Sequence, residues 1–87
     1  MTPLEALQHL NRLIEPYDYY LTWINRDEDG TPYLCVSHES NHTTFIEYSD
    51  GVYTCQETDG FYDTSTYETD CVDDVLDRLS IQSLLDA

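Results

Sequence analysis

The chain of 87 residues contains no lysine, and its three basic residues are Arg12, Arg26 and Arg78. Against them stand 18 aspartates and glutamates, so the net charge is −15. Nucleic acid and anionic membranes carry the same sign of charge, so this composition argues against both as direct partners. No apolar run is long enough to span a bilayer, and the first residues lack the basic and apolar regions of a signal peptide. We therefore expect a cytoplasmic protein.

Glycine and cysteine are also scarce, with three of each. The glycines occur singly in predicted turns, so no glycine-rich phosphate loop is present. Cys35, Cys55 and Cys71 are odd in number and far apart, which predicts free thiols and no disulfide framework. Cys35 and Cys55 alternate within predicted strands, as small core residues do.

Metal and catalytic motifs are missing as well. Cys35 and His38 form one ligand pair, whereas zinc sites usually need two such pairs. The acidic stretch that begins at Asp27 places its glycine at the fourth position, although a calcium-binding EF-hand loop needs it at the sixth. We expect no metal, no cofactor, no catalytic residue and no enzyme activity.

The first residues predict an amphipathic helix. Thr2 and Glu5 have the spacing of a capping box, Pro3 suits the first helical position, and Pro16 ends the helix. The apolar stripe of this helix repeats at helical spacing. Its members are Leu4, Leu7, Leu10, Leu13 and Ile14.

Strands are predicted at residues 17–24, 33–38, 43–48 and 52–58, where aromatic and β-branched residues alternate with polar ones. Residues 61–68 indicate either a fifth, short edge strand or an ordered loop. Short turns between successive strands imply an antiparallel meander. If the uncovered face of that sheet carries Tyr19, Tyr33 or Tyr53, it forms an aromatic interaction surface; otherwise these are ordinary half-buried strand residues.

A second helix is predicted after Thr69 or Asp70, either of which can cap it. Val72, Val75, Leu76 and Leu79 form its apolar stripe, and residues 81–87 indicate a short third helix or a bent extension. Together these elements predict an α+β fold, with one domain over residues 1–87. An antiparallel sheet of four or five strands carries the N-terminal and C-terminal helices on one face.

The acidic residues are concentrated in one part of the chain. From Asp27 to Asp77 there are fourteen acids and neither lysine nor arginine. The stretch ETDGFYDTSTYETDCVDD, residues 57–74, contains seven of them. Carboxylates on one face of a helix or strand approach the spacing of phosphates in nucleic acid, so a basic groove built for DNA or RNA accepts them. The other interpretation is a solubilising surface.

In size, acidity and lack of catalytic motifs, the chain resembles the small acidic proteins that phages direct against host defence, namely anti-CRISPR proteins and anti-restriction DNA mimics. The resemblance implies an inhibitor, in the cytoplasm of an infected host cell, that blocks the DNA- or RNA-binding channel of a CRISPR effector or another basic nucleic-acid-binding protein. The predicted partner-binding residues are Asp27, Glu28, Asp29, Glu57, Asp59, Tyr62, Asp63, Tyr67, Glu68, Asp70, Asp73, Asp74 and Asp77, with the tyrosines as aromatic anchors.

Two alternatives share the composition. An immunity protein that neutralises a basic nuclease toxin has similar size and charge and uses the same electrostatic steering. A small domain from a salt-loving organism is acidic because of its solvent, and its charge then carries no functional information. The sequence leaves the oligomeric state open.

Salt dependence separates the last alternative from the others. We expect the protein to unfold cooperatively in urea at about 0.1 M salt, where surface charges are only partly screened, and to gain stability as salt is added. Loss of the cooperative transition at that salt concentration, with recovery only in concentrated salt, would support the halophilic interpretation.

Overall fold

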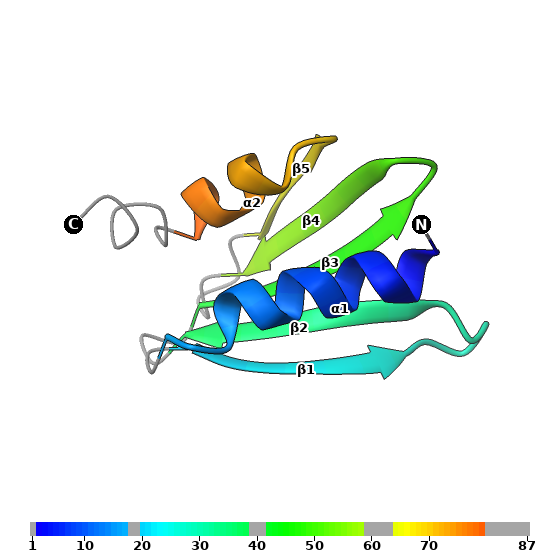
Figure 1. The fold of residues 1–87 in the computed structure, drawn as a ribbon, viewed down its shortest axis with the longest axis horizontal. Coiled ribbons are helices and arrows are strands. Elements are labelled where there is room, and N and C mark those ends of the chain that lie inside the picture. The colour runs from blue at the N-terminus through cyan, green and yellow to red at the C-terminus, as the bar shows by residue number, and fades with distance from the viewer. Residues whose placement is uncertain (1, 18–19, 39–41, 59–63, 80–87) are drawn as a thin grey trace.

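Alternating apolar residues in consecutive segments produce one antiparallel sheet in the computed structural model, which describes residues 2–17, 20–38, 42–58 and 64–79. The elements are α1 (Pro3–Ile14), β1 (Tyr20–Arg26), β2 (Pro32–His38), β3 (Thr43–Ser49), β4 (Val52–Thr58), β5 (Thr64–Thr69) and α2 (Val72–Arg78). The strands lie in the order β1-β2-β3-β4-β5, each antiparallel to the next. The predicted α+β meander is confirmed, and residues 64–69 are its fifth strand (Figure 1).

Both helices pack on the same side of the sheet. The longer helix α1 runs along the strands and packs on β1, β2 and β3, and α2 lies beside β4 and β5 (Figure 1). We call this side the helix face and the opposite side the open face. Because successive side chains of a strand point to opposite faces, each strand residue belongs to one of the two.

The predicted capping box starts α1. The Thr2 hydroxyl accepts a hydrogen bond from the Glu5 backbone N–H at 3.2 Å, and a Glu5 carboxylate oxygen accepts one from the Thr2 N–H at 3.1 Å. The bond from the Thr2 backbone holds the pKa of Glu5 below its ordinary value. Such a box satisfies two N–H groups that a helix start leaves without partners. The helix ends at Ile14, two residues before Pro16.

The core lies between the helices and the helix face. Ile46 of β3 pairs with Leu34 of β2 and with Cys55 of β4, and all three side chains are fully buried. The helices cover this row with their apolar stripes. The buried helix residues are Ala6, Leu7, Leu10, Ile14, Val75 and Leu76. Across the sheet, the Tyr20 hydroxyl donates a hydrogen bond to the carbonyl of Leu79, which joins the first strand to the residue after α2.

The two described hairpin turns lie at the same end of the sheet, which we call the hairpin end. In the β3–β4 turn, Asp50 and Gly51 have φ of 53° and 81°, as a two-residue turn with right-handed strand twist requires. In the β1–β2 turn, an Asp27 carboxylate oxygen accepts hydrogen bonds from the N–H groups of Asp29 and Thr31, at 2.9 and 3.0 Å. Both turns follow from short Asp-Gly sequences.

The structure differs from the expected boundaries at two places. The first strand begins at Tyr20 and continues to Arg26, because pairing with β2 extends to Pro32. The N-cap of α2 is Cys71, and no side chain caps this helix. Thr69 is unavailable for that role because it pairs with Tyr53 at the end of β5. The predicted extension at residues 81–87 lies outside the described residues.

The contribution of the core to stability can be tested on α1. We expect Leu10→Ala to lower the free energy of unfolding by about 2–5 kcal/mol, because Leu10 is fully buried and the cavity cannot close completely. Gln8→Ala on the exposed side of the same helix is the matched control and should change little. Urea unfolding followed by circular dichroism measures both, and equal stabilities would contradict this description of the core.

Candidate protein-binding site

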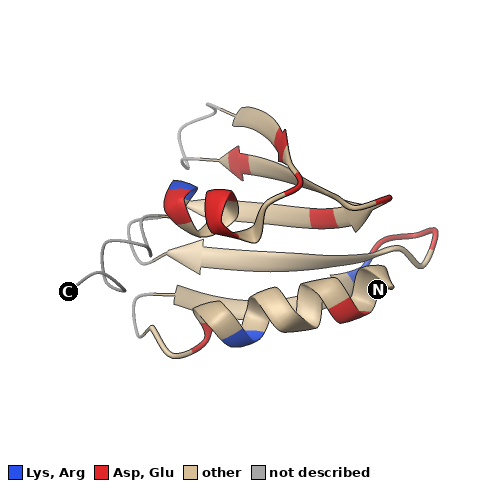
Figure 2. Cartoon of the chain, turned by 45° about the horizontal axis from the view of Figure 1, so that its top comes forward, with Lys and Arg blue, Asp and Glu red and all other residues tan. Residues whose placement is uncertain are grey.

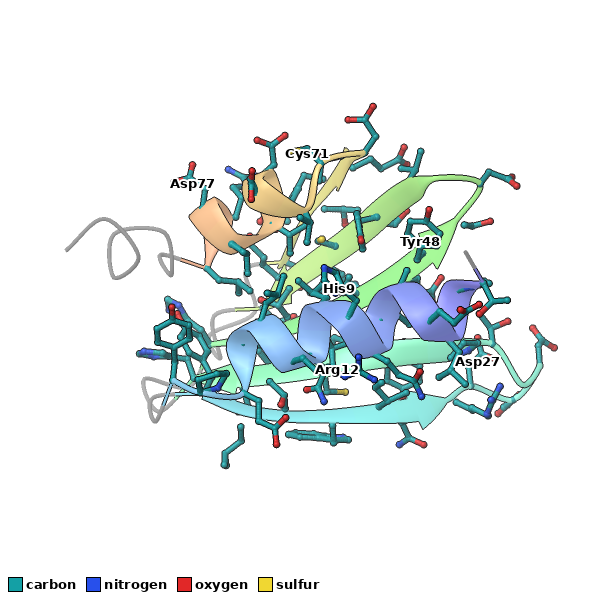
Figure 3. The ribbon with its side chains drawn as sticks, viewed as in Figure 1. His9, Arg12, Asp27, Tyr48, Cys71 and Asp77 are labelled. Atoms are coloured by element: carbon teal, nitrogen blue, oxygen red, sulfur yellow. The ribbon has the colours of Figure 1, made fainter. Side chains whose placement is uncertain are left out.

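The predicted partner-binding residues occupy separate parts of the molecule. Asp27, Glu28 and Asp29 form the β1–β2 turn, whereas most of the others follow one another at the end of β5 and along α2 (Figure 2). Asp59, Tyr62 and Asp63 lie outside the described residues. Figure 3 shows the distance between the two groups, with Asp27 at the hairpin end and Asp77 on α2.

The acids of α2 form one exposed surface. Asp73, Asp74 and Asp77 are exposed, and so is Asp70 just before the helix. Asp77 is four positions after Asp73 and three after Asp74, so these three recur on one side of the helix, and Asp70 lies just before its start. The α2 apolar stripe faces the sheet, so the carboxylates are left toward solvent. We call these four residues the α2 acidic surface.

A shallow depression adjoins the α2 acidic surface. Its lining residues are Tyr67, Glu68, Thr69, Asp74, Asp77 and Arg78, and its volume is about 250 Å³. The Thr69 hydroxyl donates a hydrogen bond to Asp74 at 2.7 Å and accepts one from the Cys71 N–H at 3.1 Å. These bonds fix one carboxylate of the surface. The depression is smaller than the roughly 300–1,000 Å³ of typical small-molecule sites.

Glu57 and Tyr67 have partners within the molecule. The guanidinium carbon of Arg78 lies 4.2 Å from the centre of the Tyr67 ring, and its Nε lies 4.0 Å from a Glu57 carboxylate oxygen. Tyr67 also packs against the core. Although both residues were predicted for the partner surface, they lie on the helix face, and their contacts position α2 against β4 and β5.

Burial changes the acidity of the groups beneath α2. The Tyr67 hydroxyl oxygen is buried and lies beside the Cys55 thiol. Burial raises its pKa far above that of an ordinary tyrosine, and it also raises the pKa of the neighbouring Cys55 thiol. Tyr67 and Cys55 are cross-strand partners, so the two protonated groups sit side by side in the core.

The open face carries a group of exposed apolar side chains that the sequence pattern did not predict. Trp23 of β1 is 46% exposed, Phe45 of β3 is 37% exposed, and Leu21 of β1 is 71% exposed. The rings of Tyr33 and Phe45 meet edge to face, with centroids 6.1 Å apart. We call Leu21, Trp23, Tyr33 and Phe45 the aromatic patch.

Cys35 lies within the aromatic patch. It pairs with Trp23 on one side and with Phe45 on the other, and its side chain is only 3% exposed although it belongs to the open face. Burial raises the pKa of its thiol. Of the tyrosines considered for an exposed face, Tyr33 is on it, Tyr53 is buried on the helix face, and Tyr19 lies outside the described residues.

Other kinds of site find little support in the described ranges. No three His, Cys, Asp or Glu side chains there are grouped so that they could hold a metal ion. Neither α1 nor α2 has the length and apolar character needed to cross a membrane. The chain matches no family model, no curated protein and no solved structure.

The buried thiols and phenols predict destabilisation at alkaline pH. Tyr20, Cys55 and Tyr67 have a higher pKa in the folded than in the unfolded protein. Their contribution to stability is complete below the unfolded pKa, about 8.5 for a thiol and 10 for a phenol, and is lost as the pH rises through the folded pKa. Urea unfolding should therefore give a free energy that falls above about pH 9, and more slowly in Tyr67→Phe. A level profile to about pH 11 would contradict the burial of these groups.

Proposed function

We propose that the protein is a non-enzymatic inhibitor that binds a basic nucleic-acid-binding protein through its acidic surface. The observation that carries the proposal is the shortage of internal partners for the carboxylates. Among the described residues, one ion pair is formed, between Arg78 and Glu57. The exposed acids of α2 take no part in this pair, and Arg26 offsets only part of the charge of the β1–β2 turn.

Holding this charge together is costly, which favours a function for it. Like charges repel and destabilise the compact state, most of all at low salt. A basic partner would remove this repulsion on binding and would gain speed of association from electrostatic steering. The channel in which a protein binds nucleic acid carries positive charge, because it must neutralise phosphates.

The α2 acidic surface is the element we propose as the mimic of nucleic acid. Residues three or four apart on a helix are about 5–6 Å from each other, so Asp73, Asp74 and Asp77 offer a short row of negative charges, to which Asp70 adds one just before the helix. A channel that binds a phosphate backbone can accept such a row without reading a base sequence. Binding there would block DNA or RNA by occupying its place. Inhibition requires no catalytic group, in keeping with the proposal of a non-enzymatic protein.

The class of partner can be tested by competition. The protein is immobilised, partners are captured from lysates of candidate hosts at low salt, and the column is eluted with a DNA duplex. Elution of one nucleic-acid-binding complex by DNA would support mimicry, and a CRISPR effector is the partner we propose first. A partner that DNA cannot displace would favour an immunity-type inhibitor. Capture of a broad mixture of basic proteins would count against a specific inhibitor.

Charge reversal then tests the surface. The double variant Asp73→Lys, Asp77→Lys should associate with the captured complex about ten-fold more slowly at low salt, because it removes steering charge from the α2 acidic surface. Asp74 is left unchanged because it bonds to Thr69. Surface plasmon resonance measures the rates.

The matched control places the same change in net charge elsewhere. Gln8→Lys, His9→Lys and Glu15→Lys together alter the total charge as much as the double variant does, but at exposed positions on α1 and at its C-cap. We expect this control to lose much less of its association rate. Equal losses in the two variants would mean that only total charge matters, and the α2 acidic surface would then not be a mimic.

A further inference from the structure

Charge is distributed unevenly over the open face. Two neighbouring rows that run across all five strands contain no charged residue, in a chain with a net charge of −15. One row is Leu21, Ser37, Thr43, Thr58 and Thr64, and the other is Trp23, Cys35, Phe45, Gln56 and Thr66. Three residues of the aromatic patch, Leu21, Trp23 and Phe45, lie in the β1–β3 part of these rows, and Tyr33 lies in the next row toward the hairpin end. An exposed apolar group on a soluble domain often marks an interaction site.

Acidic residues begin immediately beside the uncharged rows, toward the hairpin end. Glu47 and Glu68 flank Thr54 on the open face, one on β3 and the other on β5. Beyond them lies the β1–β2 turn, where Glu28 and Asp29 are exposed. Arg26 offsets part of this charge, and it is held by a 2.8 Å hydrogen bond to the carbonyl of Gly30. The aromatic patch therefore has an acidic border on one side.

Size and charge argue against a second copy of this chain as the occupant. Three strands of seven residues cover about 300 Å², whereas each partner in a standard interface contributes about 800 Å². Two copies, each with a net charge of −15, would also repel each other, and each would bring the acidic border of its own patch into the interface. A basic partner would instead be attracted by the carboxylates of this acidic border. Charge complementarity therefore selects the class of occupant.

We propose that the aromatic patch is the anchoring site for a basic protein segment that carries apolar side chains. Its apolar groups cover Trp23 and Phe45, and its basic groups pair with Glu47, Glu68 and the β1–β2 turn. Central aromatic side chains ringed by polar residues are the usual arrangement of binding hot spots. This inference rests on the proposed function, in that the partner is basic. It adds a contact on the opposite side of the sheet from α2.

The chain contains its own reporter for this site. Trp23 is the one tryptophan in the sequence, and nearly half of its side chain is exposed. Its fluorescence can be excited separately from that of the eight tyrosines. An apolar group placed over the indole shifts the emission to shorter wavelength and reduces quenching by acrylamide.

Two synthetic peptides of equal length and equal positive charge serve as probes. In one, arginine alternates with leucine and phenylalanine; in the other, arginine alternates with serine. We expect the apolar peptide to bind about ten-fold more tightly and to shift Trp23 emission, because burial of apolar surface adds to the shared attraction. The serine peptide should bind only at low salt, and its binding should leave the Trp23 emission wavelength unchanged.

Variants locate the difference on the open face. Leu21→Ser with Phe45→Thr should bring the two affinities within about two-fold, because the apolar contact is removed while the acids stay. Both side chains are partly exposed and both replacements suit an exposed strand position, and circular dichroism checks the fold. Gln56→Ser with Thr66→Ser, on the same face but outside the patch, is the matched control and should keep the ten-fold difference.

The outcomes separate this inference from the proposed function. Equal affinities of the two peptides for the unaltered protein would overturn the anchoring site and leave the acidic surface in place. A preference for the apolar peptide that survived the patch substitutions would also overturn it, since the contact would lie elsewhere. Failure of both peptides to bind at low salt would overturn the attraction to basic partners and, with it, the proposed function.

Discussion

The two-residue period of the β-strand is the constraint on which the rest of this structure depends. It assigns each strand residue to one of two faces, and α1 and α2 cover only one of them. Leu34, Ile46 and Cys55 thereby become core, whereas Trp23 and Phe45, one step out of phase with them, stay partly exposed. The separation of an apolar core from an open face with two uncharged rows follows from this single assignment. A slip of one residue in strand register would exchange the two faces.

The protein combines strong negative charge with a small core by keeping its carboxylates at the margins. Among the described residues, the exposed acids lie in turns, on or beside the two helices and at exposed strand positions such as Glu47, where water solvates them, and the buried side chains include none. Arg78 is the described residue that brings positive charge toward the β4–β5 side of the sheet. Its cation–π contact with Tyr67 stabilises the fold by about 0.5–1 kcal/mol, as such contacts do at exposed sites, and its 4.0 Å ion pair with Glu57 contributes less. Arg78 therefore helps to hold α2 against the sheet, although the carboxylates on the other side of α2 repel one another.

Local sequence patterns predicted the helices and strands, but they could not predict the contacts between elements that are distant in the chain. The Thr2–Glu5 capping box, the Asp50–Gly51 turn and strand β4 are all evident from residues within a few positions of each other. Alternation alone could not say which face the helices cover, so Tyr33 and Tyr53 were treated alike although one is half-buried on the open face and the other is buried on the helix face. Tyr67 was predicted as an aromatic anchor for a partner, because nothing near it in the sequence reveals that Arg78 stacks on its ring and that it packs against the core. The aromatic patch joins three strands, so it required the register of the sheet.

The strand order also has a kinetic consequence. Each strand pairs with its neighbour in the chain, so most of the sheet is assembled from short loop closures, and proteins dominated by local contacts fold fast for their size. The hydrogen bond from Tyr20 to Leu79 is of another kind, since 59 positions separate the two residues. It closes a loop that includes the whole sheet, so its entropy cost is smallest once the intervening hairpins have formed. On this entropy argument, β1 and the residue after α2 come together most readily after the meander has formed.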